Sequence, residues 1–167
     1  MATVPRVKLF FFELKTGPEI VAPLQQTLAQ SVVPREQIVI ISFNEATITQ
    51  CEQRMPEIES YWLTSYEQQK DKSWKPTAAE VATTIAQIGA DGLGSKAVPE
   101  HVDDAFLARL RSEGIGDFGV WTVDDPEVGR FYQRLGAWSI TTNRPKYLRR
   151  HLRQQEAAAA APAGAAP

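Results

Sequence analysis

The sequence predicts an α/β protein with a parallel β-sheet, built as one domain. Short apolar runs alternate with amphipathic helical patterns, at the spacing of about 20–30 residues that is typical of βα units. Short connections between these runs favour parallel strands joined by crossover helices. The 167 residues are enough to bury one sizeable core.

Six apolar runs are predicted as strands. The first two are almost continuously apolar, so we expect them to be buried on both faces of the sheet. The predicted strands are Val7–Lys15, Ile38–Phe43, Tyr61–Thr64, Ala90–Leu93, Phe118–Val123 and Ser139–Thr142.

The first two helices are predicted from their end signals. Pro18 and Glu19 open a helix after the first strand, because proline and an acidic residue are favourable in a first turn. Asn44 can cap the second helix, which ends near Arg54 because Pro56 prevents its continuation.

The next two helices follow a polar loop, Glu67–Trp74. Thr77 and Glu80 form a capping box, and Gly89 ends that helix. The fourth helix is predicted from apolar residues at i, i+4 and i+8, which are Val102, Phe106 and Leu110.

The last two helices lie on either side of the final strand. Asp124 or Asp125 caps the first of them, and Pro126 occupies its first turn. The other begins at Pro145, and its arginines near the expected end suit the helix dipole; they are Arg149, Arg150 and Arg153. We expect residues 1–155 to form the domain and the alanine-rich residues 156–167 to be disordered.

Composition excludes several classes of protein. A formal net charge of −2 and a pI near 5.7 give no basic footprint, so nucleic acid is not expected as the main partner. A single cysteine, Cys51, excludes an internal disulfide and is expected to be a small packing residue. No apolar run approaches the length of about 18–20 residues that spans a membrane, and no signal-peptide core is present, so a cytoplasmic location is the default expectation.

The end of the first strand carries the best candidates for chemistry. Side chains alternate along a strand, so Glu13 and Lys15 share a face. A carboxylate suits Mg²⁺ or Ca²⁺, and an ammonium group suits a phosphate oxygen. The alternative is an ordinary salt bridge at the rim of the sheet, which is the commoner arrangement.

Aromatic side chains near other strand ends are weaker candidates. Phe43 and Trp121 could form an apolar wall for a small substrate, although core packing is the simpler reading of their spacing. His101 and His151 lie in or beside predicted helices, and we expect solvent-exposed side chains rather than a base or a metal ligand. No P-loop, serine-hydrolase elbow, zinc-protease motif or dinucleotide loop is present.

Five segments in a fixed order resemble the C-terminal part of the glycerophosphodiester phosphodiesterase family. They are FFELKTGPEIV, IVIISFN, PTAAEVATTIAQIGADGL, GVWTVDDPE and SITTNRPKYLR. The resemblance implies a TIM-type (β/α)₈ barrel that hydrolyses glycerophosphodiesters to an alcohol and glycerol 3-phosphate with a divalent metal, Ca²⁺ or Mg²⁺. It further implies that Glu13 binds the metal, that Lys15 contacts the phosphate, and that Phe43 and Trp121 line the glycerol side of the pocket.

The chain also departs from that family. The family's N-terminal His-Arg-Gly strand, its Glu-Leu-Asp strand with two more metal carboxylates, and its later His-Asp pair have no counterpart here. A (β/α)₈ barrel takes about 250 residues, so we expect an incomplete barrel formed by the C-terminal βα units. With one metal carboxylate, weak metal binding and no appreciable hydrolysis are expected from this chain alone.

Two alternatives to catalysis remain open. An incomplete barrel leaves unpaired strand edges, before Val7 and after Thr142, and these favour self-association or pairing with a partner chain. The chain could instead bind a small anion through Lys15 without chemistry.

Overall fold

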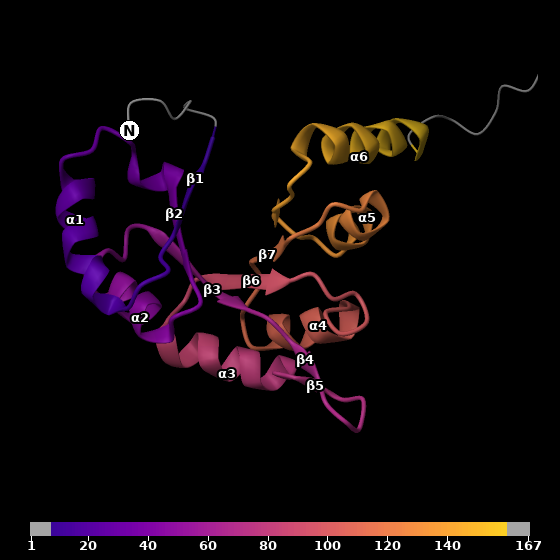
Figure 1. The fold of residues 1–167 in the computed structure, drawn as a ribbon, viewed down its shortest axis with the longest axis horizontal. Helices are drawn as coiled ribbons and strands as arrows, with labels where there is room; N and C mark the ends of the chain where they lie inside the picture. The colour runs from indigo at the N-terminus through magenta and orange to yellow at the C-terminus, as the bar shows by residue number, and fades with distance from the viewer. Residues whose placement is uncertain (1–7, 160–167) are drawn as a thin grey trace, which may run out of the picture.

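A computed structural model describes residues 8–159, and side chains as far as residue 153. Within this range, six parallel strands form one sheet in the order β1-β2-β3-β6-β7-β8. The sheet curls into an open half-barrel with the helices on its outer side, as expected for an incomplete TIM-type barrel (Figure 1). The strands are β1 (Phe10–Glu13), β2 (Ile38–Ser42), β3 (Glu59–Thr64), β6 (Gly92–Lys96), β7 (Phe118–Trp121) and β8 (Ser139–Ile140).

The second, third and fifth helices begin where the capping signals place them. The first helix begins at Val21, after a 3-10 turn at the predicted start, and the fourth begins at Asp104, so Val102 lies before it. Asn44 and Thr77 accept hydrogen bonds from the first turns of their helices, Glu80 completes the capping box, and Gly89 takes the left-handed conformation. Of the two aspartates proposed to cap the fifth helix, Asp125 does so. The helices are α1 (Val21–Ala29), α2 (Glu45–Arg54), α3 (Ala78–Ile88), α4 (Asp104–Ser112), α5 (Pro126–Arg134) and α6 (Pro145–Ala159), with short 3-10 turns at Pro18–Ile20 and Arg35–Gln37.

The outer face of the sheet packs against the helices and forms the core. Trp62, Leu93 and Phe118 project from three neighbouring strands into one apolar cluster with α3 and α4. A second cluster, which includes Ile40 and Leu28, joins β1 and β2 to α1 and α2. Cys51 is fully buried in this second cluster, so its predicted role as a packing residue is confirmed.

The prediction that the first strand is buried on both faces is wrong. In the described part of the chain, β1 forms the edge of the sheet and pairs with β2 alone, so it lacks a second neighbouring strand. Phe10 and Phe11 are 37% and 40% exposed, whereas the equally apolar β2 has neighbours on both sides and is largely buried. The predicted strand start at Val7 lies outside the described residues.

Glycines on the inner face of the sheet make room for large side chains from neighbouring strands. A Cβ atom on Gly92 would lie 2.3 Å from the Tyr61 ring, and one on Gly94 would lie 2.3 Å from Leu63. At Gly92 the backbone carbonyl oxygen of Asp117 also lies within 2.5 Å of that Cβ position, so glycine is required there, whereas at Gly94 the Leu63 side chain would have to change its conformation. Side chains of β3, rather than of β6, therefore fill this part of the inner side of the half-barrel.

Residues 67–74 form more than the expected polar loop. Glu67–Gln68 (β4) pairs antiparallel with Trp74–Lys75 (β5), which makes a small hairpin after β3. The Trp74 ring stacks on the His101 ring, with centroids 5.7 Å apart and planes 14° apart. This packing ties the hairpin to the segment before α4.

Both histidines differ from the expectation of free, solvated side chains. His101 is half-buried among aromatic rings, and its Nε2 lies 2.9 Å from the carbonyl oxygen of Pro76. His151 is half-buried on α6, with Nδ1 2.9 Å from the carbonyl oxygen of Tyr147. Aromatic neighbours, which the sequence spacing does not reveal, account for both.

Helix α6 extends to Ala159, four residues into the segment expected to be disordered, and residues 160–167 lie outside the described range. The helix is longer than the sequence predicted, so its arginines occupy its middle turns rather than its end. In the described part of the chain, no helix combines the length and apolar character that crossing a bilayer requires.

Candidate functional site

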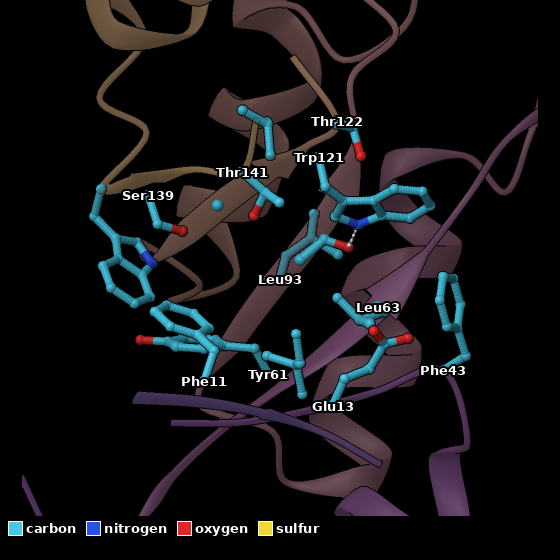
Figure 2. Close-up of a pocket in the computed structure, with 15 residues that line it drawn as sticks. Phe11, Glu13, Phe43, Tyr61, Leu63, Leu93, Trp121, Thr122, Ser139 and Thr141 are labelled. Carbon is cyan, nitrogen blue, oxygen red and sulfur yellow. Dashed lines mark hydrogen bonds between the residues drawn. The ribbon is translucent and has the colours of Figure 1, made fainter. Parts of the chain in front are cut away.

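A pocket of about 220 Å³ opens on the inner face of the half-barrel, at the carboxyl ends of the strands. Functional sites in parallel α/β barrels lie at this end. The pocket is smaller than the about 300–1,000 Å³ typical of sites for drug-sized ligands, so it suits a small molecule. Figure 2 shows Glu13, Phe43 and Trp121 around it, together with Leu63 and Thr122.

Glu13 ends β1, and the backbone beyond it is fastened to β2. The amide of Leu14 donates to the carbonyl oxygen of Ile41 at 2.9 Å, and the buried Ser42 hydroxyl donates to the carbonyl oxygen of Leu14 at 2.7 Å. Farther along, the Thr47 hydroxyl donates to the carbonyl oxygen of Thr16. These bonds hold the Glu13 carboxylate at the mouth although β1 is an edge strand.

Lys15 lies next to Glu13 but outside the pocket lining. Its Nζ is 3.6 Å from a Glu13 carboxylate oxygen, and its side chain is 77% exposed. The salt bridge that we considered as the alternative is therefore present. Because the lysine remains exposed at the rim, its ammonium group is also free to meet an anion that enters the mouth.

Phe43 and Trp121 lie side by side on one wall of the pocket (Figure 2). Their ring centroids are 5.4 Å apart in an edge-to-face arrangement, and Phe43 is 50% exposed. The Trp121 indole donates to the carbonyl oxygen of Gly94 at 3.0 Å, and the Trp62 indole donates to the carbonyl oxygen of Phe43 at 3.3 Å. These aromatics are not core residues; they form an apolar wall at the mouth.

Sequence reasoning missed most of the other side chains that line the pocket. Tyr61 lies below the mouth; burial raises the pKa of its hydroxyl, which donates to Glu59 at 3.0 Å. Phe11 lies on the same face of β1 as Glu13, as the alternation of side chains along a strand predicts. Trp138, which precedes the last strand, carried no signal in the sequence, and it stacks on Phe11.

Polar groups at the mouth include two hydroxyls and one further lysine. Thr122 and Thr141 line the pocket and are exposed. Lys96 ends β6 and pairs in register with Trp121, which places it on the inward-facing side of its strand. Its side chain is exposed at the rim, so it joins Lys15 as a candidate for binding an anion.

The pocket does not by itself supply a complete site for a divalent metal. Glu13 is the carboxylate that lines it, and the part of the chain that the structure describes holds no group of three or more His, Cys, Asp or Glu side chains able to share an ion. Ca²⁺ and Mg²⁺ take six or more oxygen ligands, usually with more than one carboxylate. Neither His101 nor His151 lines the pocket.

Comparison with known families covers the part of the chain that forms this pocket. The sequence model of the Glycerophosphoryl diester phosphodiesterase family matches residues 12–147, which include Glu13, Lys15, Phe43 and Trp121. This chain belongs to that family. A search of curated proteins finds no match.

Solved structures share the fold at low sequence identity. A protein from Silicibacter pomeroyi described as a glycerophosphoryl diester phosphodiesterase aligns with a TM-score of 0.70 and 20% identity, over 89% of this chain and 51% of its own. A glycerophosphodiester phosphodiesterase from Parabacteroides distasonis aligns with a TM-score of 0.63 and 21% identity, over 89% of this chain and 58% of its own.

A third structure is an Oleispira antarctica phosphodiesterase in complex with the product sn-glycerol 3-phosphate. It aligns with a TM-score of 0.63 and 15% identity, over 81% of this chain and 50% of its own. The chain therefore spans between half and three fifths of the length of these three proteins.

Proposed function

We propose that the pocket binds the glycerol phosphate part of a glycerophosphodiester. One observation carries the proposal: Glu13, Phe43 and Trp121, which are far apart in the sequence, meet at one pocket in a chain of this family. Phe43 and Trp121 would contact the glycerol carbons. Lys15 would contact the phosphate, with Lys96, at the end of β6, as a second cation.

The chemistry of the mouth suits such a ligand. The glycerol phosphate part of a diester has a short carbon chain with hydroxyls at one end and one negative charge, on the phosphodiester, at the other; free glycerol 3-phosphate carries up to two. An aromatic wall covers carbon-bound hydrogens, exposed threonine hydroxyls can bond to the glycerol hydroxyls, and lysines at the rim attract the phosphate. The Glu13–Lys15 contact of 3.6 Å is loose, so the ammonium group has donors to spare for a phosphate.

We further propose that this chain alone does not hydrolyse glycerophosphodiesters at an appreciable rate. Glu13 provides one carboxylate toward a Ca²⁺ or Mg²⁺ ion, and both histidines of the chain pack elsewhere. Phosphodiester cleavage needs stabilisation of charge on the phosphoryl oxygens and a group that moves protons. The residues at this pocket supply part of the charge stabilisation, but they include no histidine that could move protons.

Release of glycerol 3-phosphate from glycerophosphocholine tests this part of the proposal. The purified chain, with Ca²⁺ or Mg²⁺ added, should give the same background rate as Glu13→Ala. A rate well above that control would show that the chain is a complete enzyme. If Glu13→Ala and the wild type give the same rate and glycerol 3-phosphate still binds measurably, the chain is a binding protein for small anions.

A second candidate is association of two copies through the free edge of β1. Phe10, on the edge strand, and Leu9, just before it, are 37% and 46% exposed, and among residues 8–159 the outer edge of β1 has no neighbouring strand. Exposed apolar edges favour pairing with another chain. Light scattering should then give a mass that rises with concentration, and Phe10→Lys should lower it; a monomer at every concentration would contradict this candidate.

A further inference from the structure

Positive charge is concentrated on the last helix of an otherwise acidic protein. The chain has 18 Lys and Arg against 20 Asp and Glu, and residues 144–153 hold five of those cations and no acidic residue. All five are exposed. They are Arg144, Lys146, Arg149, Arg150 and Arg153.

Four of these cations form one stripe along α6. Residues three and four apart are neighbours on a helix, so Lys146 lies beside Arg149 and Arg150, and Arg153 lies beside the same two arginines. The opposite side of the helix carries Leu148, which is buried against α5 and lies 3.0 Å from where a Cβ on Gly129 would be. The stripe therefore faces solvent while the apolar side holds the helix in place.

The folding of α6 does not explain the stripe. Like charges at these spacings destabilise a helix by about 0.2–0.5 kcal/mol per pair. Lys146 lies in the first turn, which has no acidic residue and where the helix dipole disfavours a cation. The arginines do not gain from the dipole at the other end either, because the helix continues to Ala159.

We propose that this stripe binds the surface of a bilayer that contains anionic lipids. Clusters of four to eight Lys and Arg on a helix are the usual signal for such binding. A flat surface lets the whole stripe make contact at once, and screening over about 8–10 Å keeps the acidic remainder of the chain from opposing it.

Nucleic acid fits the stripe less well than a membrane does. Proteins that bind single strands interleave basic groups with exposed aromatic rings on which bases stack. Tyr147, the aromatic residue nearest the stripe, is covered by the guanidinium of Arg144 at 3.9 Å from its ring centroid, and its other neighbour is the His151 ring at 4.2 Å. No exposed ring is left beside the stripe among the described residues.

Co-sedimentation with vesicles tests the proposal on the full chain. Vesicles of phosphatidylcholine with about 30% phosphatidylserine should bind the protein, and pure phosphatidylcholine should not. Removing two cations with Arg149→Gln/Arg150→Gln should weaken binding about 30-fold. Lys70→Gln/Lys72→Gln, which removes two exposed cations from the hairpin, is the matched control and should bind as the wild type does.

Several results would overturn the proposal. These are absence of binding to the anionic vesicles, equal loss in the two double variants, and binding that high salt does not weaken. Tighter binding to single-stranded RNA than to the vesicles would also overturn it and would assign the stripe to nucleic acid. Because no substrate is involved, the result does not depend on whether the pocket binds glycerol phosphate.

Discussion

The ring of Phe11 stacks on the indole of Trp138, with centroids 5.6 Å apart and planes 21° apart. Phe11 lies on β1, at one edge of the sheet, and Trp138 directly precedes β8, at the other edge. The two edges of the curled sheet thus make contact through side chains across its inner face. Tyr61, from β3, adds a third ring 5.3 Å from Trp138.

This contact predicts an energetic coupling between the two edges. In a double-mutant cycle with Phe11→Ala and Trp138→Ala, the coupling energy should be about 0.5–1.5 kcal/mol in urea unfolding, the range for stacked aromatic pairs. A cycle of Phe11→Ala with Phe131→Ala, on α5, should give a coupling near zero. A Phe11–Trp138 coupling as small as that control would mean that the edges do not meet in solution.

A second prediction concerns the glycines of the inner face. Gly92→Ala should lower the free energy of unfolding by about 1–3 kcal/mol, because the new methyl group collides with the Tyr61 ring and with the carbonyl oxygen of Asp117 at 2.5 Å. Gly116→Ala is the control, since a Cβ there meets nothing within 4 Å. It should leave stability unchanged or raise it slightly by restricting the unfolded chain. Equal effects of the two substitutions would contradict this close packing of Gly92 against Tyr61.

The third prediction is a pH dependence centred on Glu52. Burial, with Asp91 nearby, raises the pKa of this carboxyl to about 7, although the Ser60 hydroxyl that donates to it acts in the opposite direction. The folded state thus holds the proton more tightly than the unfolded chain, whose pKa is 4.5. The stability that this group contributes is complete below pH 4.5 and is lost as the pH rises through about 7.

Glu52→Gln should therefore stabilise the protein more at pH 8 than at pH 5, by about 1–2 kcal/mol after allowance for partial solvent exposure. Denaturant unfolding at the two pH values measures this difference. Glu57→Gln removes the same charge from an exposed site and sets the background effect. An advantage of Glu52→Gln that is the same at both pH values would exclude the raised pKa.

The hairpin gives a fourth prediction. Trp74→Ala removes the ring that stacks on His101, so the β4–β5 hairpin should open more often and trypsin should cleave after Lys70 or Lys72 several times faster. Trp138→Ala, a substitution of the same kind far along the chain, should leave the cleavage rate in the hairpin unchanged. Equal cleavage of the wild type and Trp74→Ala would show that the stack does not hold the hairpin.

Local signals in the sequence placed most elements well. Asn44, Thr77 and Gly89 determine helix ends through contacts within a few residues, so their effects can be predicted without the fold. The exposure of β1 could not be predicted in this way. An apolar strand looks the same in sequence whether it has one neighbour or two, and only the strand order reveals the difference.

Some residues of the pocket can be predicted from the sequence, and others cannot. Glu13, Phe43 and Trp121 follow from strand ends and family resemblance, and the structure brings them together. Trp138 and Lys96 depend on how strands pair across the sheet, which the spacing along the chain does not encode. The burial of His101 cannot be predicted from the sequence, because its ring partners Trp74 and Tyr66 are distant along the chain.

Titration of the purified chain with sn-glycerol 3-phosphate tests the proposed function most directly, by calorimetry and by the NMR signal of the Trp121 indole. We expect saturable binding that shifts this signal. Lys15→Met should weaken the binding at least about fivefold, because a charge-assisted bond to phosphate is lost. Lys70→Met, which removes a lysine far from the pocket, should bind as the wild type does. Absence of saturable binding, or equal affinity of Lys15→Met and Lys70→Met, would contradict the assignment of this pocket to glycerol phosphate.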